Sequence, residues 1–241
     1  MRVTSTDIQN NFGKYLKFAE AGEEIIVTRN GKDVATLNAI AGAGLSMLRE
    51  KAASYHGGGE WVSYQEFLEL TETSEQRYEL IDGIVYNLAS PSFKHQLAIN
   101  ELHGTFYNWF KGKPCTPLTS PLDITLEKED NNTCVVQPDL VVICDKDRID
   151  ANGKYKGTPQ LVVEVLSPST RSKDMIKKLD LYSVCGVKEY WIIDPMKALV
   201  IVYTLEDGNI ADMTVFSNTG DAHVTSQLYP GLQVSIQDLI A

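Results

Sequence analysis

The chain has 241 residues, 43% of them hydrophobic and 22% charged, and its formal net charge is −10. That length suits one large domain, or a medium domain with a small appendage. No apolar stretch approaches the roughly 20 residues that a membrane span needs, and the N-terminus lacks the apolar core of a signal peptide. We therefore expect a soluble, cytoplasmic protein without a membrane partner. The negative charge argues against broad electrostatic adhesion to nucleic acid.

The four cysteines are far apart and show no CxxC spacing: Cys115, Cys134, Cys144 and Cys185. In a reducing compartment this pattern predicts free thiols rather than disulfides or a zinc site.

Glycine clusters divide the chain. AGAG (41–44) and GGG (57–59) bracket LSMLREKAASYH, which we interpret as a short helix within a linker over 41–59. A small unit over 1–40 then precedes a larger domain over 60–241. In the small unit, a capping box at Thr6–Gln9 predicts a helix that ends at Gly22, and Asn30-Gly31 predicts a hairpin. Forty residues bury too little surface to be robust alone, so we expect a homodimer.

The stretch MRVTSTDIQNNFGKYLKFAEAGEEIIVTRNGKDVATL resembles the Phd/YefM antitoxins. The resemblance implies a dimeric unit that binds operator DNA and a C-terminal tail that wraps a toxin. Two interpretations stay open, retained DNA binding and a purely dimerising unit, because acidic residues balance the basic residues available for phosphates. A toxin partner is not expected, since the tail is short and another domain follows it.

The larger domain mixes both element types. Helix, hairpin at Asp82-Gly83 and helix are expected over its first fifty residues, followed by strand-like runs in PLDITL, CVVQPDLVVIC and LVVEVLS. A helix over SKDMIKKLDLYSVCG, a central strand in VKEYWIIDP and a final antiparallel meander around Asp207-Gly208 complete it. The predicted fold class is α+β.

Acidic residues interrupt these apolar runs. Glu164 lies inside LVVEVLS, where an ionised carboxylate costs several kcal/mol unless it is paired, protonated or bound to a cation. Asp139 lies in VVQPDLVVIC, and Glu79 begins the RYELIDG strand. Carboxylates on neighbouring strands repel unless they share a divalent cation, and oxygen ligands select Mg²⁺ or Mn²⁺. Such a metal suits phosphodiester hydrolysis.

The spacing is similar to that of the PD-(D/E)xK nuclease fold, in which PD is followed by E-x-K. The expected lysine position holds Leu166. In the next helix, however, Asp174, Lys178 and Tyr182 recur every four residues and share one face.

The combination of YELIDG, SP…H, PD, LVVEVLSPST and D-x₃-K-x₃-Y-x₃-G resembles the Uma family of endonucleases in the PD-(D/E)xK superfamily, over about 60–241. The resemblance implies a restriction endonuclease-like sheet, a metal held by Glu79, Asp139 and Glu164, and a migrated catalytic lysine at Lys178. His95, Asp174 and Tyr182 are accessory candidates, and Arg171, Lys173 and Lys177 are nucleic-acid-binding candidates.

Structural explanations stay open for each residue. Glu164 could pair with an arginine, Lys178 could be a solvated lysine with Lys177 as its rival, and Asp174 could merely pair with Lys178. His95 could be a hydrogen-bonded structural residue.

The predicted function is a metal-dependent endonuclease with nucleic acid, expected to be DNA, as its substrate. The alternatives are a DNA-binding regulator or antitoxin-like module on an inactive nuclease fold, and an interaction protein without a nucleic-acid role.

Overall fold

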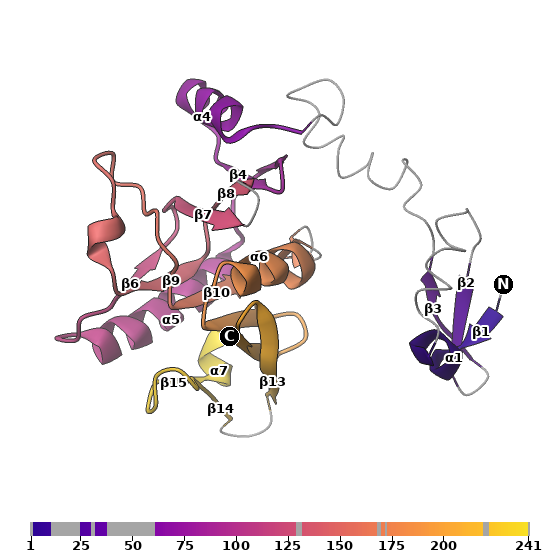
Figure 1. Ribbon diagram of the computed structural model, residues 1–241. Coiled ribbons are helices and arrows are strands. Elements are labelled where there is room, and N and C mark those ends of the chain that lie inside the picture. The colour runs from indigo at the N-terminus through magenta and orange to yellow at the C-terminus, as the bar shows by residue number, and fades with distance from the viewer. Residues whose placement is uncertain are drawn as a thin grey trace. The chain divides into compact units, whose positions relative to one another are not determined.

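The computed structural model describes residues 2–10, 25–29, 32–37, 61–128, 132–167, 170–171, 173–218 and 222–240. The chain divides into two compact units, Met1–Glu60 and Trp61–Ala241 (Figure 1). The predicted linker helix and the end of the predicted N-terminal helix lie outside the described residues. Within the described part, no helix is long and apolar enough to cross a membrane.

The first unit is a small sheet with one helix. It contains β1 (Arg2–Thr4), α1 (Ser5–Asn10), β2 (Ile25–Arg29) and β3 (Lys32–Leu37), in the order β1-β2-β3. β1 runs parallel to β2, and β3 pairs antiparallel to β2 as the predicted hairpin requires. Among its described residues the buried core consists of Val3 and Ile25, with Ile8 and Leu37 packed against them. Most of β3 is exposed.

The second unit begins with a helix and a four-stranded sheet in the order β5-β4-β8-β7. The helix begins at a capping box in which Ser63 and Glu66 satisfy each other's backbone N–H groups. These elements are α4 (Tyr64–Thr73), β4 (Tyr78–Ile81), β5 (Ile84–Asn87), β7 (Ile124–Lys128) and β8 (Asn132–Val136).

A six-stranded sheet in the order β13-β12-β11-β10-β9-β6 forms the centre. Its strands are β6 (Thr116–Thr119), β9 (Leu140–Ile143), β10 (Leu161–Val165), β11 (Glu189–Asp194), β12 (Leu199–Glu206) and β13 (Asn209–Ser217). β10 and β11 are parallel and fully buried, as their continuous apolar sequences predict, and the other pairs are antiparallel. The predicted mixed α+β fold is confirmed.

Each face of this sheet has its own core. One face packs against α5 (Phe93–Phe110), α7 (Ile236–Leu239) and the β14–β15 pair (His223–Thr225 and Gln233–Ser235). The other face carries Val162 and Leu166 and packs against α6 (Leu179–Val184) and side chains of the four-stranded sheet. Because side chains alternate along a strand, Glu164 points to the same face as Val162 and Leu166.

The helix predicted after β10 is present, but its first part is wider than an α-helix. Lys173–Lys178 form η3, a π-helical turn that continues directly into α6. π-Helical turns are uncommon and occur often at functional sites.

Two expectations are corrected. The run CVVQPDLVVIC is not one strand, because Pro138 has no N–H to donate to a ladder. β8 ends at Val136 and β9 begins at Leu140, and the two strands belong to different sheets. Asp139 therefore precedes β9 rather than lying inside a strand. A short 3₁₀ turn, η2 (Lys146–Arg148), follows β9.

The second correction concerns the cysteines. Cys115 and Cys144 form a disulfide, whereas Cys134 and Cys185 are free thiols. The cause is sheet pairing: Thr116 lies opposite Ile143, so the residues that flank this pair also lie opposite each other. A separation of 29 residues gave no sign of this in the sequence.

The predicted Asp82-Gly83 and Asp207-Gly208 hairpins are both present, with positive φ at all four residues. At Gly83, φ is +72°, and an added Cβ would lie 2.0 Å from Cδ1 of Trp61. Gly104 lies within α5, and an added Cβ there meets no atom within 4 Å.

These two glycines predict opposite effects on stability. We expect Gly83→Ala to lower the free energy of unfolding by about 1–2 kcal/mol, the cost of a left-handed backbone with a side chain. Gly104→Ala should raise it by up to about 1 kcal/mol, because alanine loses less backbone entropy in a helix. Urea denaturation of both variants measures these changes. If both substitutions changed the free energy of unfolding in the same direction, the assignment of the turn would be contradicted.

Candidate active site

A cluster of buried charges lies between β10 and the helix that follows it. Glu164, at 4% relative exposure, extends from the middle of β10, and Asp174 and Lys178, at 2% each, extend from η3. Glu79, which is fully buried, comes from β4 in the four-stranded sheet. β10 and η3, which follow each other in the sequence, and β4, from far earlier in the chain, therefore bring their charged groups to one place.

Lys178 lies at the centre of this cluster. Its Nζ is 2.7 Å from Oε1 of Glu164 and 2.8 Å from Oε1 of Glu79. Oδ1 of Asp174 is 3.7 Å away. Burial alone would lower the pKa of Lys178, but the charges of Glu164, Glu79 and Asp174 raise it well above its usual value. Lys178 is therefore a permanent ammonium at neutral pH.

Glu79 accepts hydrogen bonds at both carboxylate oxygens. Oε1 accepts from the Gln137 backbone N–H at 2.9 Å as well as from Lys178, and Oε2 accepts from Lys173 Nζ. Burial alone would raise the pKa of Glu79, yet the charges of Lys178 and Lys173 lower it to about 2. Glu79 therefore stays ionised in the interior.

The π-helical turn explains how both lysines reach Glu79. Lys173 and Lys178 are five residues apart, and in an α-helix two such residues point about 140° away from each other. A π-helix bonds residue i to i+5, so its wider turn brings these positions towards one face. The helix then returns to α geometry, and Tyr182 in α6 donates its hydroxyl to Oε1 of Glu164 at 2.9 Å.

Asp139 lies beside Glu164 on the neighbouring chain segment. Its Oδ2 accepts a hydrogen bond from the Val165 backbone N–H at 2.8 Å, which fixes it at the end of the β9–β10 ladder. His95, from the first turn of α5, places Nε2 3.2 Å from the same oxygen. Burial alone would lower the pKa of His95, but the hydrogen bond to Asp139 and the charge of Asp139 raise it.

The cluster holds more negative than positive charge. Four carboxylates, from Glu79, Asp139, Glu164 and Asp174, face the ammonium groups of Lys173 and Lys178. Burial, reinforced by the charges of Asp174, Asp139 and Glu79, raises the pKa of Glu164 well above its usual value despite Lys178. Burial also raises the pKa of Asp174. A cation or a proton would relieve this excess.

Two carboxylate oxygens in the cluster are not engaged by donors from the described residues. Oδ1 of Asp139 and Oε2 of Glu164 accept no hydrogen bond from the described residues, whereas both oxygens of Glu79 are engaged by donors. No group of three His, Cys, Asp or Glu side chains among the residues described converges on a metal position. Magnesium is commonly held by one or two carboxylates together with water and substrate phosphates, so the Asp139–Glu164 pair suits it.

Several predicted contributors lie in other environments. Arg171 pairs with the buried Asp194, and Lys173 is only 10% exposed at its side chain and pairs with Glu79. Both side chains are therefore already engaged by carboxylates. Lys177, the sequence rival of Lys178, is half-buried and makes no ion pair with the described residues. Leu166 packs into the core at the position where the strand lysine was expected.

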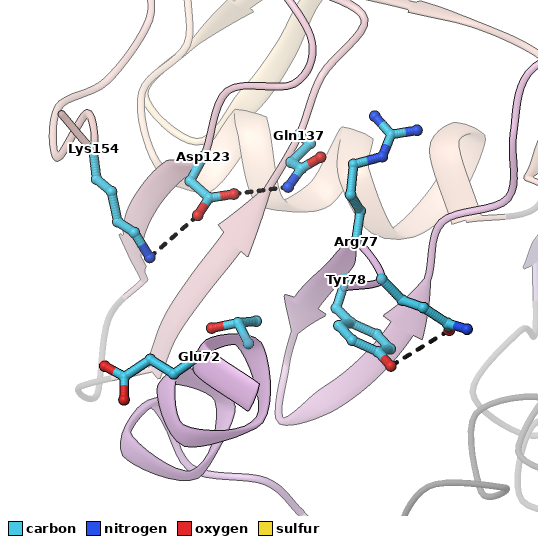
Figure 2. A pocket seen from close by; sticks show the side chains of 8 residues that line it. Glu72, Arg77, Tyr78, Asp123, Gln137 and Lys154 are labelled. Atoms are coloured by element: carbon cyan, nitrogen blue, oxygen red, sulfur yellow. Dashed lines mark hydrogen bonds and ion pairs between the residues drawn. The ribbon is translucent and has the colours of Figure 1, made fainter. Parts of the chain in front are cut away.

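One feature beside the cluster was not predicted. A hollow of about 260 Å³ is lined by α4, the start of β4, and Asp123, Gln137 and Lys154. Lys154 and Gln137 both contact Asp123, as the dashed lines of Figure 2 mark. The distances to the Asp123 carboxylate are 3.3 Å from Lys154 Nζ and 2.8 Å from Gln137 Nε2. Arg77 lines the same hollow and has no ion pair with the described residues. Gln137 belongs to both the hollow and the charge cluster, because it lines the hollow and its backbone N–H donates to Oε1 of Glu79. No residue spacing in the sequence indicates this neighbourhood.

The low pKa of Glu79 predicts a pH dependence of stability. A carboxyl group with a folded pKa of about 2, against an ordinary value of 4.5, contributes stability above pH 4.5 that is lost as the pH falls through 2. The difference in unfolding free energy between wild type and Glu79→Gln should therefore shrink by on the order of 3 kcal/mol from about pH 5 to about pH 2. Denaturant titration at several pH values measures it.

The matched control is Glu206→Gln, at the exposed end of β12. It should show no such trend. A constant difference for Glu79→Gln across the same range would contradict the buried ion pairs.

Comparisons with known proteins agree with this fold. A crystal structure of "a putative nuclease belonging to DUF820" from Anabaena variabilis superposes with a TM-score of 0.60, at 24% identity, over 74% of this chain and 97% of that one. A Synechocystis protein named "Uncharacterized protein slr1290" is 35% identical over 123 residues, which are 51% of this chain and 62% of that protein.

Two family profiles match the chain. Residues 1–40 match the Phd/YefM antitoxins of type II toxin–antitoxin systems. Residues 64–237 match Uma2, described as "Putative restriction endonuclease", and this match covers the charge cluster and most of the chain. The chain belongs to the Uma2 family.

Proposed function

We propose that the second unit is a metal-dependent endonuclease that hydrolyses phosphodiester bonds in nucleic acid, with DNA as the expected substrate. The observation that carries the proposal is the buried ammonium of Lys178, 2.7 Å from Glu164, together with an Asp139 carboxylate whose Oδ1 accepts no hydrogen bond from the described residues. Two acids and a lysine from neighbouring segments are the groups that metal-assisted hydrolysis needs.

Asp139 and Glu164 are the residues that would hold Mg²⁺ or Mn²⁺. A divalent ion bound there would polarise the phosphoryl oxygen and lower the pKa of the attacking water. Val165 N–H and His95 fix one oxygen of Asp139, while Lys178 and Tyr182 fix one oxygen of Glu164. The opposite oxygen of each carboxylate is thereby left for the metal.

Lys178 contributes charge rather than a proton-accepting group, since its raised pKa keeps it protonated. A fixed ammonium beside the scissile phosphate stabilises negative charge that develops in the transition state. His95 orients Asp139, and Asp174 adds negative charge next to Lys178. For the substrate backbone we favour Lys177 and Arg77, which make no ion pair within the described part of the chain, over Arg171 and Lys173, which are already paired with carboxylates.

Metal binding should depend on Asp139. Isothermal titration with Mn²⁺ should show binding to the wild type, and Asp139→Ala should abolish it because one of two carboxylate ligands is lost. The wild type, incubated with plasmid, single-stranded DNA and RNA, should cleave nucleic acid with Mg²⁺ or Mn²⁺ and should stop when EDTA is added. Equal Mn²⁺ binding by both proteins would remove the metal site.

Lys178 and Lys177 provide a matched pair in one helical segment. Lys178→Ala should lower the cleavage rate by a factor on the order of 10²–10³, a typical loss for one electrostatic donor, with little change in Mn²⁺ affinity. Lys177→Ala should stay close to wild type in rate. Equal rates for the two variants would refute the role of Lys178, and a larger loss for Lys177→Ala would move the role by one residue.

A second candidate function is DNA-binding regulation by an antitoxin-like module with an inactive nuclease fold. The match of residues 1–40 to Phd/YefM antitoxins favours it. In the first unit, Arg29 and Lys32 pair across the β2–β3 hairpin and supply positive charge at its end. If the wild type binds duplex DNA but cleaves nothing with either metal, this second function is the better one.

The first unit also predicts assembly. Its buried core of two residues and the exposed side chains of β3 suit pairing with a second copy in a two-fold dimer. Deleting residues 1–56 should therefore weaken or abolish dimerisation in sedimentation at micromolar concentration. A truncated protein that remains a dimer would show that the nuclease unit carries its own interface.

A further inference from the structure

We infer that Glu79 and Lys173 are positioning residues for Lys178, and that Glu79 is not a metal ligand. The inference deepens the proposed function and rests on it. The residues from which we argue are Glu79 on β4, Lys173 and Lys178 on η3, and Tyr86 on β5.

Glu79 has little capacity left for a metal. A carboxylate oxygen has two lone-pair sites, and Oε1 already accepts from Lys178 Nζ at 2.8 Å and from Gln137 N–H at 2.9 Å. Oε2 accepts from the ammonium of Lys173. The side chain is fully buried, so a cation that approached it would be repelled by two ammonium groups at close range.

Lys173 is fixed in turn by β5. Glu79 and Tyr86 lie opposite each other in the β4–β5 ladder, and Lys173 Nζ lies 5.3 Å from the centroid of the Tyr86 ring. A cation over an aromatic face is attracted by the ring quadrupole. Lys173 is therefore held between the Glu79 carboxylate and the Tyr86 ring and is not free to bind a phosphate of the nucleic acid.

The pairing of one carboxylate with two lysines has an electrostatic consequence. With Lys178 alone, Glu79 would neutralise it, and little positive charge would remain for Glu164 and the substrate. Because Lys173 shares the charge of Glu79, the trio carries a net positive charge. The π-helical turn makes this possible, since it presents residues five apart to one carboxylate. Glu79 thus orients Lys178 towards Glu164 without neutralising the positive charge of Lys178.

The test is a double-mutant cycle in the full-length protein. Glu79→Gln keeps the shape of the side chain but removes its charge. We expect it to lower kcat about 10²-fold with KM unchanged, and to lower kcat less than threefold when it is introduced into Lys178→Met, because Glu79 acts through Lys178. Mn²⁺ affinity should stay within about threefold of wild type, whereas Asp139→Asn should lose about 100-fold.

Lys173→Met provides a second variant that removes the inferred charge sharing while leaving every carboxylate in place. It should lower kcat about tenfold with unchanged Mn²⁺ affinity, even if Glu79→Gln proves too unstable to assay. Glu206→Gln, on the exposed end of β12, is the control that should leave all values unchanged.

Loss of Mn²⁺ binding in Glu79→Gln, comparable to that in Asp139→Asn, would overturn the inference and make Glu79 a ligand. Equal losses of kcat in the wild-type and Lys178→Met backgrounds would overturn it as well. If the wild type neither binds Mn²⁺ nor cleaves, the proposed function fails instead. Urea unfolding of the wild type, Glu79→Gln, Lys178→Met and the double variant then tests the pairing of Glu79 with Lys178. Glu79→Gln should change the equilibrium constant of unfolding at least tenfold more in the wild-type background than in the Lys178→Met background.

Discussion

The site depends on the ion pairs between the ammonium of Lys178 and the buried carboxylates around it. Burying Glu79, Glu164 and Asp174 without a cation would cost several kcal/mol for each ionised group. Lys178 lies within 2.8 Å of two of these carboxylates and so joins β4 of one sheet to β10 of the other. The two sheets, the helix after β10 and Glu164 are therefore connected through one ammonium group.

Much of this could be predicted from residue patterns. The apolar runs around Glu164 and Tyr190 predict buried central strands, and the Asp-Gly pairs predict both hairpins, because each signal is local. The four-residue spacing of Asp174, Lys178 and Tyr182 also indicates one face. Leu166 occupies the strand position where a lysine was expected, and the ammonium that lies beside Glu164 is that of Lys178, from the following helix.

Other features depend on tertiary contacts that no local pattern encodes. The partnership of Lys173 with Glu79 requires a π-helical turn, and the sequence of Lys173–Lys178 is compatible with an ordinary α-helix. The break between β8 and β9 follows from Pro138, but the assignment of the two strands to different sheets does not. The Cys115–Cys144 disulfide similarly follows from the pairing of β6 with β9 and not from cysteine spacing.

The central claim is that charge balance around Lys178 leaves a metal position between Asp139 and Glu164. Anomalous diffraction from crystals grown with Mn²⁺ tests it most directly, because manganese scatters anomalously and the charge cluster contains no sulfur. We expect one strong peak in contact with a carboxylate oxygen of Asp139 and one of Glu164, with Glu79 still bonded to Lys173 and Lys178. A fully loaded crystal without a peak at that position would contradict it.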